Sequence, residues 1–176
     1  MPARRLGILG GTFDPLHVGH MDVGDAAYAA LRLTEMVLVT SNVPPHRPQP
    51  LTSAYHRFAM VAIAVQGRPG WQAADLELRH AAPSYTSRTL DRFHDRGYEA
   101  VELFFVIGAD AFVEIESWRD YPNILEAAHF VVVSAGAAGR AGVGTAAAPR
   151  LADGDRSRGS AVVGGPVDYF DRRADL

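Results

Sequence analysis

Short apolar runs alternate with stretches of helical spacing along most of the chain. The apolar runs predict buried strands at 6–9, 36–40, 71–78, 101–107 and 129–133. The stretches between them predict helices at 18–33, 53–64 and 86–95. Ser53 is a suitable N-cap for the second helix, and Gly67 and Gly97 stand where the second and third helices should end.

This alternation of strands and helices indicates βαβ units, and therefore an α/β fold with a mostly parallel sheet covered on both faces. Ligands of such sheets bind beyond the carboxyl ends of the strands, near the point where the strand order reverses. We therefore expect the functional loops to be those after Leu9, Thr40, Leu78 and Ile107.

The pattern ends before the chain does. Residues 135–148 are mostly glycine and alanine, and a polar stretch follows at 152–160. Such composition carries little core, so we expect one folded core at 1–134 and a partly flexible tail at 135–176. Within that tail, 167–170 is apolar enough for a short closing element.

Composition narrows the function classes. The net charge is −3, all seventeen basic residues are arginine, and cysteine is absent. A nucleic-acid partner, a thiolate metal site and a lysine-dependent P-loop are therefore not expected. There is also no apolar run of membrane-spanning length and no secretory signal, which favours a cytoplasmic protein without a membrane partner. The sequence leaves open a homo-oligomer.

The densest chemical signal is the segment Gly-Gly-Thr-Phe-Asp-Pro-Leu-His-Val-Gly-His at 10–20. Two glycines after a strand allow a ligand to approach the backbone closely. Pro15 and the following residues are expected to begin a helix, whose N-terminus provides unpaired N–H groups and partial positive charge that suit a phosphate. His17 and His20 lie one helical turn apart, so both imidazoles can face the same anion. Gly19 leaves room for an incoming nucleotide.

Other interpretations of this segment are weaker. It matches neither the dinucleotide-binding glycine pattern nor the P-loop. Two histidines could ligate zinc, but the loop supplies no third and fourth ligand. The remaining histidines have no functional role predicted from the pattern.

These residues resemble the HxGH nucleotidyltransferase superfamily, and within it the bacterial nicotinate mononucleotide adenylyltransferases. The resemblance runs from about Leu6 to Val133. Besides the segment at 10–20, it rests on Pro-Pro-His-Arg at 44–47, His-Arg at 56–57, Pro-Ser-Tyr-Thr at 83–86, Thr-Leu at 89–90, Ile-Gly-Ala-Asp at 107–110, and Trp118.

The resemblance implies a Rossmann-like, doubly wound parallel sheet of five strands. It also implies transfer of AMP from ATP to nicotinate mononucleotide (NaMN), with release of pyrophosphate. Mg²⁺ is the implied cofactor, reaching the site through the substrate phosphates rather than through a metal site of the protein. The implied partners are therefore an NTP and a small acceptor that bears a phosphate.

Residue roles follow from the same resemblance. His17 and His20 would be catalytic, holding the NTP phosphates and the charge that develops in the transition state. The nucleotide and its phosphates would contact Gly10, Gly11, Thr12, Phe13, Arg47, Gly108 and Asp110. The acceptor would contact Tyr85, Thr86 and Trp118. Arg47 stands where the family usually has lysine, which keeps the charge but changes the donor geometry.

The family's Ser/Thr-rich segment ending in arginine, which grips the triphosphate, has no counterpart in this sequence. The arginine-containing stretches at 156–158 and 172–173 are candidate substitutes. This departure keeps two alternatives open. One is a CTP-dependent cytidylyltransferase acting on a small phosphonate or phosphorylated metabolite, and the other is a nucleotide-binding relative without turnover.

Overall fold

The computed structural model describes residues 4–45, 48–80, 82–135 and 141–145. Its strands are β1 (Leu6–Gly11), β2 (Glu35–Thr40), β3 (Trp71–Ala74), β4 (Leu103–Gly108), β5 (His129–Ala135) and β6 (Ala141–Thr145). Its α-helices are α1 (Val18–Ala30), α2 (Ala54–Val65), α3 (Thr86–His94) and α4 (Ala109–Phe112). Three 3₁₀ turns, η1 (Ala100–Glu102), η2 (Ile115–Ser117) and η3 (Asn123–Glu126), complete the described elements.

All six strands join one sheet in the order β3-β2-β1-β4-β5-β6. The first five run parallel, which confirms the predicted Rossmann-like arrangement. β6 was not predicted and pairs antiparallel with β5. It arises from the glycine- and alanine-rich stretch, where the side chains carry too little pattern to indicate a strand. The apolar stretch at 167–170 lies outside the described residues.

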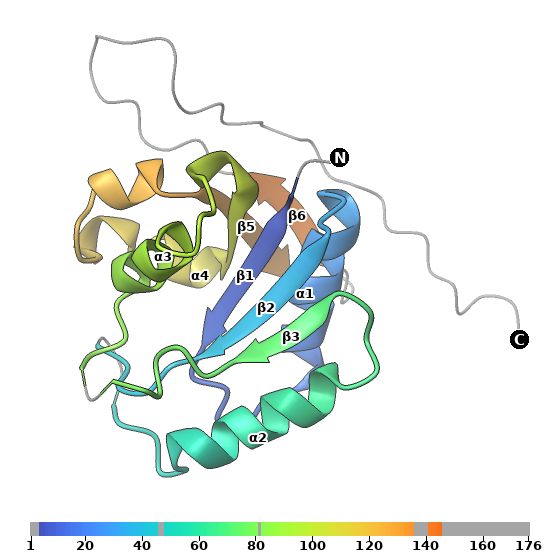
Figure 1. The fold of residues 1–176 in the computed structure, drawn as a ribbon, viewed down its shortest axis with the longest axis vertical. Helices are drawn as coiled ribbons and strands as arrows, with labels where there is room; N and C mark the ends of the chain where they lie inside the picture. The colour runs from blue at the N-terminus through green and yellow to red at the C-terminus, as the bar shows by residue number, and fades with distance from the viewer. Residues whose placement is uncertain (1–3, 46–47, 81, 136–140, 146–176) are drawn as a thin grey trace, which may run out of the picture.

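The strand order places a switch point beside β1. From β1 the chain moves outward to β2 and β3, then returns to lay β4 against the other side of β1 (Figure 1). The connections after β1 and β4 therefore leave the sheet in opposite directions. Between them they open the crevice in which ligands of such sheets bind.

Alternating side chains of the strands form two cores, one on each face of the sheet. Leu6 and Ile8 of β1 pack in a cluster with Leu90 and Phe93 of α3. Leu9 packs on the other face, in the cluster that includes residues of α1 and α2. Burial of both faces explains why the strands read as continuous apolar runs.

Several predicted boundaries are confirmed, and others need correction. The Ser53 hydroxyl accepts a hydrogen bond from the His56 N–H at 3.3 Å, so Ser53 caps α2 as predicted. Gly67 and Gly97 have φ of 76° and 82°, as expected just past helix ends. The third strand ends at Ala74, because residues 75–78 form a turn closed by the Leu78 N–H on the Asp75 carbonyl. None of the helices in the described ranges has the length and apolar character needed to cross a bilayer.

Candidate active site

A cavity of about 740 Å³ lies at the carboxyl ends of β1, β2 and β4. Its lining comes from the segment after β1, the proline-rich segment after β2, the residues around the start of α3, and the turn after β4. The predicted loops after Leu9, Thr40 and Ile107 therefore meet at one site, together with Ser84 and Tyr85 from the predicted loop after Leu78. The site lies beside the switch point of the sheet, which is where the topology favours a ligand.

The turn after β1 is shaped by a close contact between a glycine and an aromatic ring. A Cβ at Gly11 would lie 2.7 Å from the Phe13 ring, so only glycine fits there without displacing the ring. Phe13 is 2% exposed and has φ of 52°, in the left-handed region. Its ring contacts the His20 ring edge-on, with 5.1 Å between centroids. Phe13 is thus a buried support beneath the turn, and it also lines the cavity.

The predicted helix start at Pro15 is wrong, because α1 begins at Val18. His17 has extended backbone angles, φ −139° and ψ 169°, and is the N-cap. The turn at 14–15 and this extended residue keep the chain from entering the helix earlier. The His20 N–H donates to the His17 carbonyl at 3.0 Å, so the first-turn donors without an acceptor in the described chain are the N–H groups of Val18 and Gly19. These two groups and the partial positive charge of the helix end lie beside the turn.

His17 and His20 are brought together as predicted. Their ring centroids are 3.8 Å apart and both residues line the cavity. The His17 backbone N–H donates to Nδ1 of His20 at 3.3 Å. Since Nδ1 accepts, the neutral His20 ring carries its proton on Nε2, where it is a hydrogen-bond donor. Burial and the neighbouring His17 lower the pKa of His20 below its ordinary value.

Gly19 leaves room for the ring of a neighbouring histidine. A Cβ at this position would lie 3.2 Å from Nδ1 of His17. The absence of a side chain therefore lets the His17 ring lie over the first turn of α1, next to His20.

Aromatic residues and an arginine form the opposite wall. Tyr85, Thr86 and Trp118 all line the cavity, and the Trp118 ring meets Phe105 edge-on at 6.2 Å. Arg119 also lines it, with its guanidinium carbon 4.9 Å from the centroid of the Tyr85 ring. Tyr85 and Trp118 are half-buried rather than sealed in the core. This wall therefore offers a planar ligand two aromatic faces and a cation.

Asp110 lies in the turn after β4, where its carboxylate reaches the site. It is exposed and lines the cavity, and Gly108 rather than Asp110 is the N-cap of α4. A Cβ at Gly108 would lie 2.6 Å from Oδ1 of Asp110. Gly108 thus leaves the space that the Asp110 carboxylate occupies, so the position of this carboxylate depends on a glycine at 108.

The remaining predicted residues have simple placements. Gly10, Gly11 and Thr12 line the cavity. Arg47 lies outside the described residues, as do the stretches at 156–158 and 172–173. His94 is structural, since its ring bonds the carbonyls of Tyr98 and Ala127.

A buried carboxyl group supports the segment before α3. Glu77 is 9% exposed and accepts a hydrogen bond from the Thr89 hydroxyl at 2.5 Å. Glu77 also forms a hydrogen bond with Ser84. The Ser84 hydroxyl accepts a further hydrogen bond from the Asn42 N–H at 2.9 Å. Burial raises the pKa of Glu77, against the lowering by its hydrogen bonds with Ser84 and Thr89.

We expect Glu77→Gln to stabilise the protein at neutral pH. The pKa of Glu77 is higher in the folded protein than in the unfolded protein. Glu77 therefore contributes most to stability at pH below its unfolded-state pKa, and this contribution is lost as pH rises through its folded-state pKa. Glutamine keeps an acceptor for Thr89 without a charge to bury. Thermal unfolding from pH 4 to pH 8 should therefore show a higher Tm for the variant at pH 8 and a difference that shrinks toward pH 4. Exposed Glu126→Gln is the control, and a constant difference across the range would contradict this account.

Two arginines at or near the cavity were given no role by sequence reasoning. Arg119 directly follows Trp118, and this neighbour is the one sequence feature that could have pointed to Arg119 as a residue of the cavity. Arg57 is 1% exposed in α2 and occupies the same helix stripe as Val61 and Val65, which are also buried. A charged residue four positions before one buried valine and eight before another is an unusual pattern that the sequence does display.

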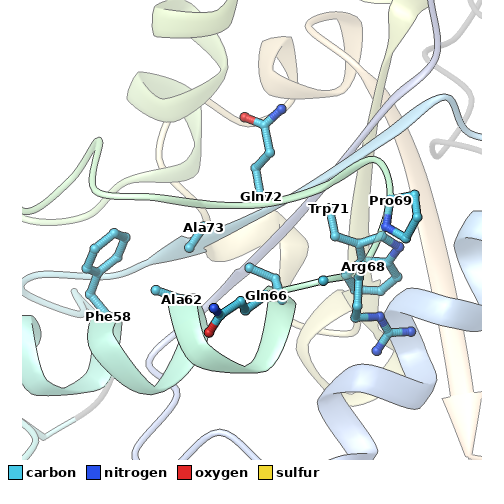
Figure 2. A pocket seen from close by; sticks show the side chains of 10 residues that line it. Phe58, Ala62, Gln66, Arg68, Pro69, Trp71, Gln72 and Ala73 are labelled. Carbon is cyan, nitrogen blue, oxygen red and sulfur yellow. The ribbon is translucent and has the colours of Figure 1, made fainter.

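Two further features of the surface carry no comparable chemistry. Among the described residues, no group of three or more histidine, aspartate or glutamate side chains is placed to hold a metal ion. A second hollow, of about 610 Å³, lies between α2 and β3 and is lined by Phe58, Gln66, Trp71 and their neighbours (Figure 2). Its lining within the described chain includes no histidine or carboxylate.

Comparisons with known proteins place the chain among nucleotidyltransferases. It is 43% identical over 131 residues to a probable nicotinate-nucleotide adenylyltransferase of Desulfatibacillum aliphaticivorans, covering 74% of this chain and 59% of that protein. It is 37% identical over 125 residues to a protein of the same description from Escherichia coli, covering 71% and 59%. The chain thus spans about three fifths of the length of these relatives.

Solved structures show the same fold. The nicotinic acid mononucleotide adenylyltransferase of Plasmodium falciparum complexed with NaAD matches with a TM-score of 0.63 and 23% identity, over 76% of this chain and 65% of that one. Its complex with APC matches with a TM-score of 0.60. At this identity the likeness concerns the fold alone. The family model described as cytidylyltransferase-like matches residues 8–159, so the chain belongs to the cytidylyltransferase-like family.

Proposed function

We propose that the chain transfers AMP from ATP to nicotinate mononucleotide and releases pyrophosphate. The observation that carries this proposal is the pair of imidazoles, with centroids 3.8 Å apart, at the N-terminus of α1 beside the switch point. The relatives described as nicotinate-nucleotide adenylyltransferases support the choice of ATP and this acceptor.

The reaction needs charge neutralisation more than covalent chemistry. An oxygen of the acceptor phosphate attacks the α-phosphorus of ATP, a new P–O bond forms, and the bond from the α-phosphorus to the bridging oxygen breaks to release pyrophosphate. Both reactants are anions, so their repulsion must be offset before in-line attack. The Nε2–H of His20, the ring of His17 and the N–H groups at 18 and 19 are donors suited to that charge.

The opposite wall suits the acceptor. Tyr85 and Trp118 provide aromatic surface for a pyridine ring, and Thr86 lies at the first position of α3 next to them. The guanidinium of Arg119 lies over the Tyr85 ring. It is a suitable partner for a carboxylate carried by the pyridine ring of the acceptor.

Mg²⁺ fits this site only together with the nucleotide. The described residues do not cluster three acidic or histidine ligands, although the carboxylates of Asp14, Asp110 and Glu114 line the cavity. Mg²⁺ commonly binds through substrate phosphates, waters and one or two carboxylates, so one or two of these three residues are the candidates to complete its shell. When bound, it would neutralise phosphate charge and favour departure of pyrophosphate.

Pyrophosphate release tests the proposal directly. The chain should be assayed with ATP, CTP, GTP and UTP, each against NaMN, its amide counterpart and small phosphonates. Activity greatest with ATP and NaMN is the expected result. Preference for CTP with another acceptor would instead assign a cytidylyltransferase, and nucleotide binding without turnover in any pair would assign a non-catalytic relative.

ATP binding should depend on pH through His20. Its pKa is lowered in the free protein, and polyphosphate favours the charged ring, so the bound-state pKa must be higher. Binding then takes up a proton, and affinity falls as pH rises from the free to the bound pKa. Calorimetry in buffers of different ionisation enthalpy measures this uptake. His20→Asn should take up less, and equal uptake by the two proteins would rule out His20 as the group.

Gly108→Ala should imitate Asp110→Ala. The added methyl would lie 2.6 Å from Oδ1 of Asp110 and must displace the carboxylate. Loss of a hydrogen bond from a charged group raises KM for ATP by about ten- to a hundredfold. Steady-state kinetics should show similar rises in both variants, with the double variant little worse than either. Val113→Ala, at an 82% exposed position just past α4, is the control, and fully additive effects would contradict the pairing.

A further inference from the structure

Arg57 is a buried charge whose hydrogen bonds all go to backbone carbonyls. It belongs to α2 and is 1% exposed. Its Nε donates to the Thr52 carbonyl at 3.1 Å, and Nη1 donates to the carbonyls of Thr12 and Ser41 at 2.5 and 2.9 Å. Its Nη2 donates to the Asn42 carbonyl at 3.4 Å. One guanidinium thus joins the turn after β1, the segment after β2 and the entry to α2.

These bonds fix how the turn presents itself to the cavity. In a trans peptide the C=O and the following N–H point in opposite directions. Because the Thr12 carbonyl points to Arg57, the Phe13 N–H points away from Arg57. The segment after β2 is held from its other side, since the Asn42 N–H donates to the Ser84 hydroxyl. Arg57 and Ser84 therefore clamp between them the segments that line the cavity.

Among the described residues, no carboxylate forms an ion pair with Arg57. Asp14 attracts the guanidinium charge from a longer range. Burial lowers the pKa of Arg57, but an arginine stays charged at physiological pH. Carbonyl dipoles offset a buried charge only in part. A net positive potential therefore remains directly behind the turn after β1.

We propose that Arg57 is a positioning residue that sets the phosphate-binding turn and makes a polyphosphate in the cavity the counter-ion of its buried charge. This proposal rests on the proposed function, because it takes the ligand of the turn to be the NTP triphosphate. The positioning of the turn and the pairing with polyphosphate both need the guanidinium. Lysine would keep the charge but cannot bridge several carbonyls with a planar set of donors, and methionine would keep neither.

Binding of inorganic tripolyphosphate, ATP and adenosine to wild type, Arg57→Met, Arg57→Lys and Val61→Ala tests the proposal by calorimetry. Val61 is the matched control, because it lies one turn further along α2, is fully buried and does not line the cavity. We expect Arg57→Met to bind tripolyphosphate and ATP about ten- to a hundredfold more weakly and adenosine nearly as well as wild type. Arg57→Lys should fall between the two, and Val61→Ala should bind all three ligands normally when folded.

Hydrogen exchange keeps the test decisive if Arg57→Met does not fold. In Arg57→Lys the amides at 12–14 and 41–43 should exchange faster than in Val61→Ala, compared at equal distance below each Tm. The proposal is overturned if Arg57→Lys matches Val61→Ala in both tripolyphosphate affinity and exchange. It is also overturned if wild type binds no tripolyphosphate or ATP. A wild type that binds triphosphate through Arg57 but forms no product with NaMN would overturn the proposed function alone.

Discussion

Replacing His17 or His20 by alanine is expected to lower turnover by about a hundred- to a thousandfold, the usual loss on removing one preorganised donor to a transition state. The two rings lie together beside the first turn of α1, and Nε2 of His20 is left as a donor. The negative charge they meet grows as the α-phosphorus is attacked. Acceptor KM should therefore change far less than kcat.

Rapid-quench or steady-state kinetics with ATP and NaMN measures this loss. His56→Ala is the control, since that side chain is exposed on α2 and does not line the cavity. A near-normal rate in either His17→Ala or His20→Ala would show that the ring in question has no catalytic role. An equal rise in acceptor KM, with kcat preserved, would show that it acts in binding instead.

Among the variants proposed for this turn and its controls, Phe13→Ala should lose the most stability, about 3–5 kcal/mol in the free energy of unfolding. The Phe13 ring is 2% exposed, lies against Gly11 and meets the edge of His20. Alanine at φ of 52° keeps the same left-handed backbone, so the loss reports the removed ring. Turnover should fall as well, because His20 loses the surface that orients it.

Urea unfolding measures the first effect and kinetics the second. Tyr55→Ala removes an aromatic ring that is 69% exposed, and its cost should stay within about 0.5 kcal/mol. If Phe13→Ala cost no more than Tyr55→Ala, the turn would not depend on a buried aromatic support. Gly11→Ala, which forces the same ring aside, should lie between them.

The repeating pattern of the chain was sufficient to predict its layers. The apolar runs at 6–9 and 101–107 mark strands buried on both faces, and this signal does not depend on distant contacts. The second strand nevertheless begins at Leu103, because residues 100–102 form η1. The glycine pair at 10–11 and the histidines at 17 and 20 are local as well, so their meeting at one turn followed from spacing. The likeness to a known family added Tyr85 and Trp118, which both line the cavity.

Features that depend on contacts between distant segments could not be predicted. β6 exists because β5 offers a free edge, not because its own residues indicate a strand. The start of α1 at Val18 depends on the extended backbone of His17. Arg57 serves carbonyls in other segments, which sequence spacing cannot reveal. In each case the local structure is decided by a contact with another part of the chain rather than by the properties of the residue itself.

A crystal structure of the chain with Mg²⁺ and a non-hydrolysable ATP analogue tests the central claim most directly. The account predicts phosphate oxygens within hydrogen-bond distance of His17, His20 and the first N–H groups of α1, over the turn that Gly11 and Phe13 form. A triphosphate bound elsewhere, with both imidazoles contacting only water, would contradict it.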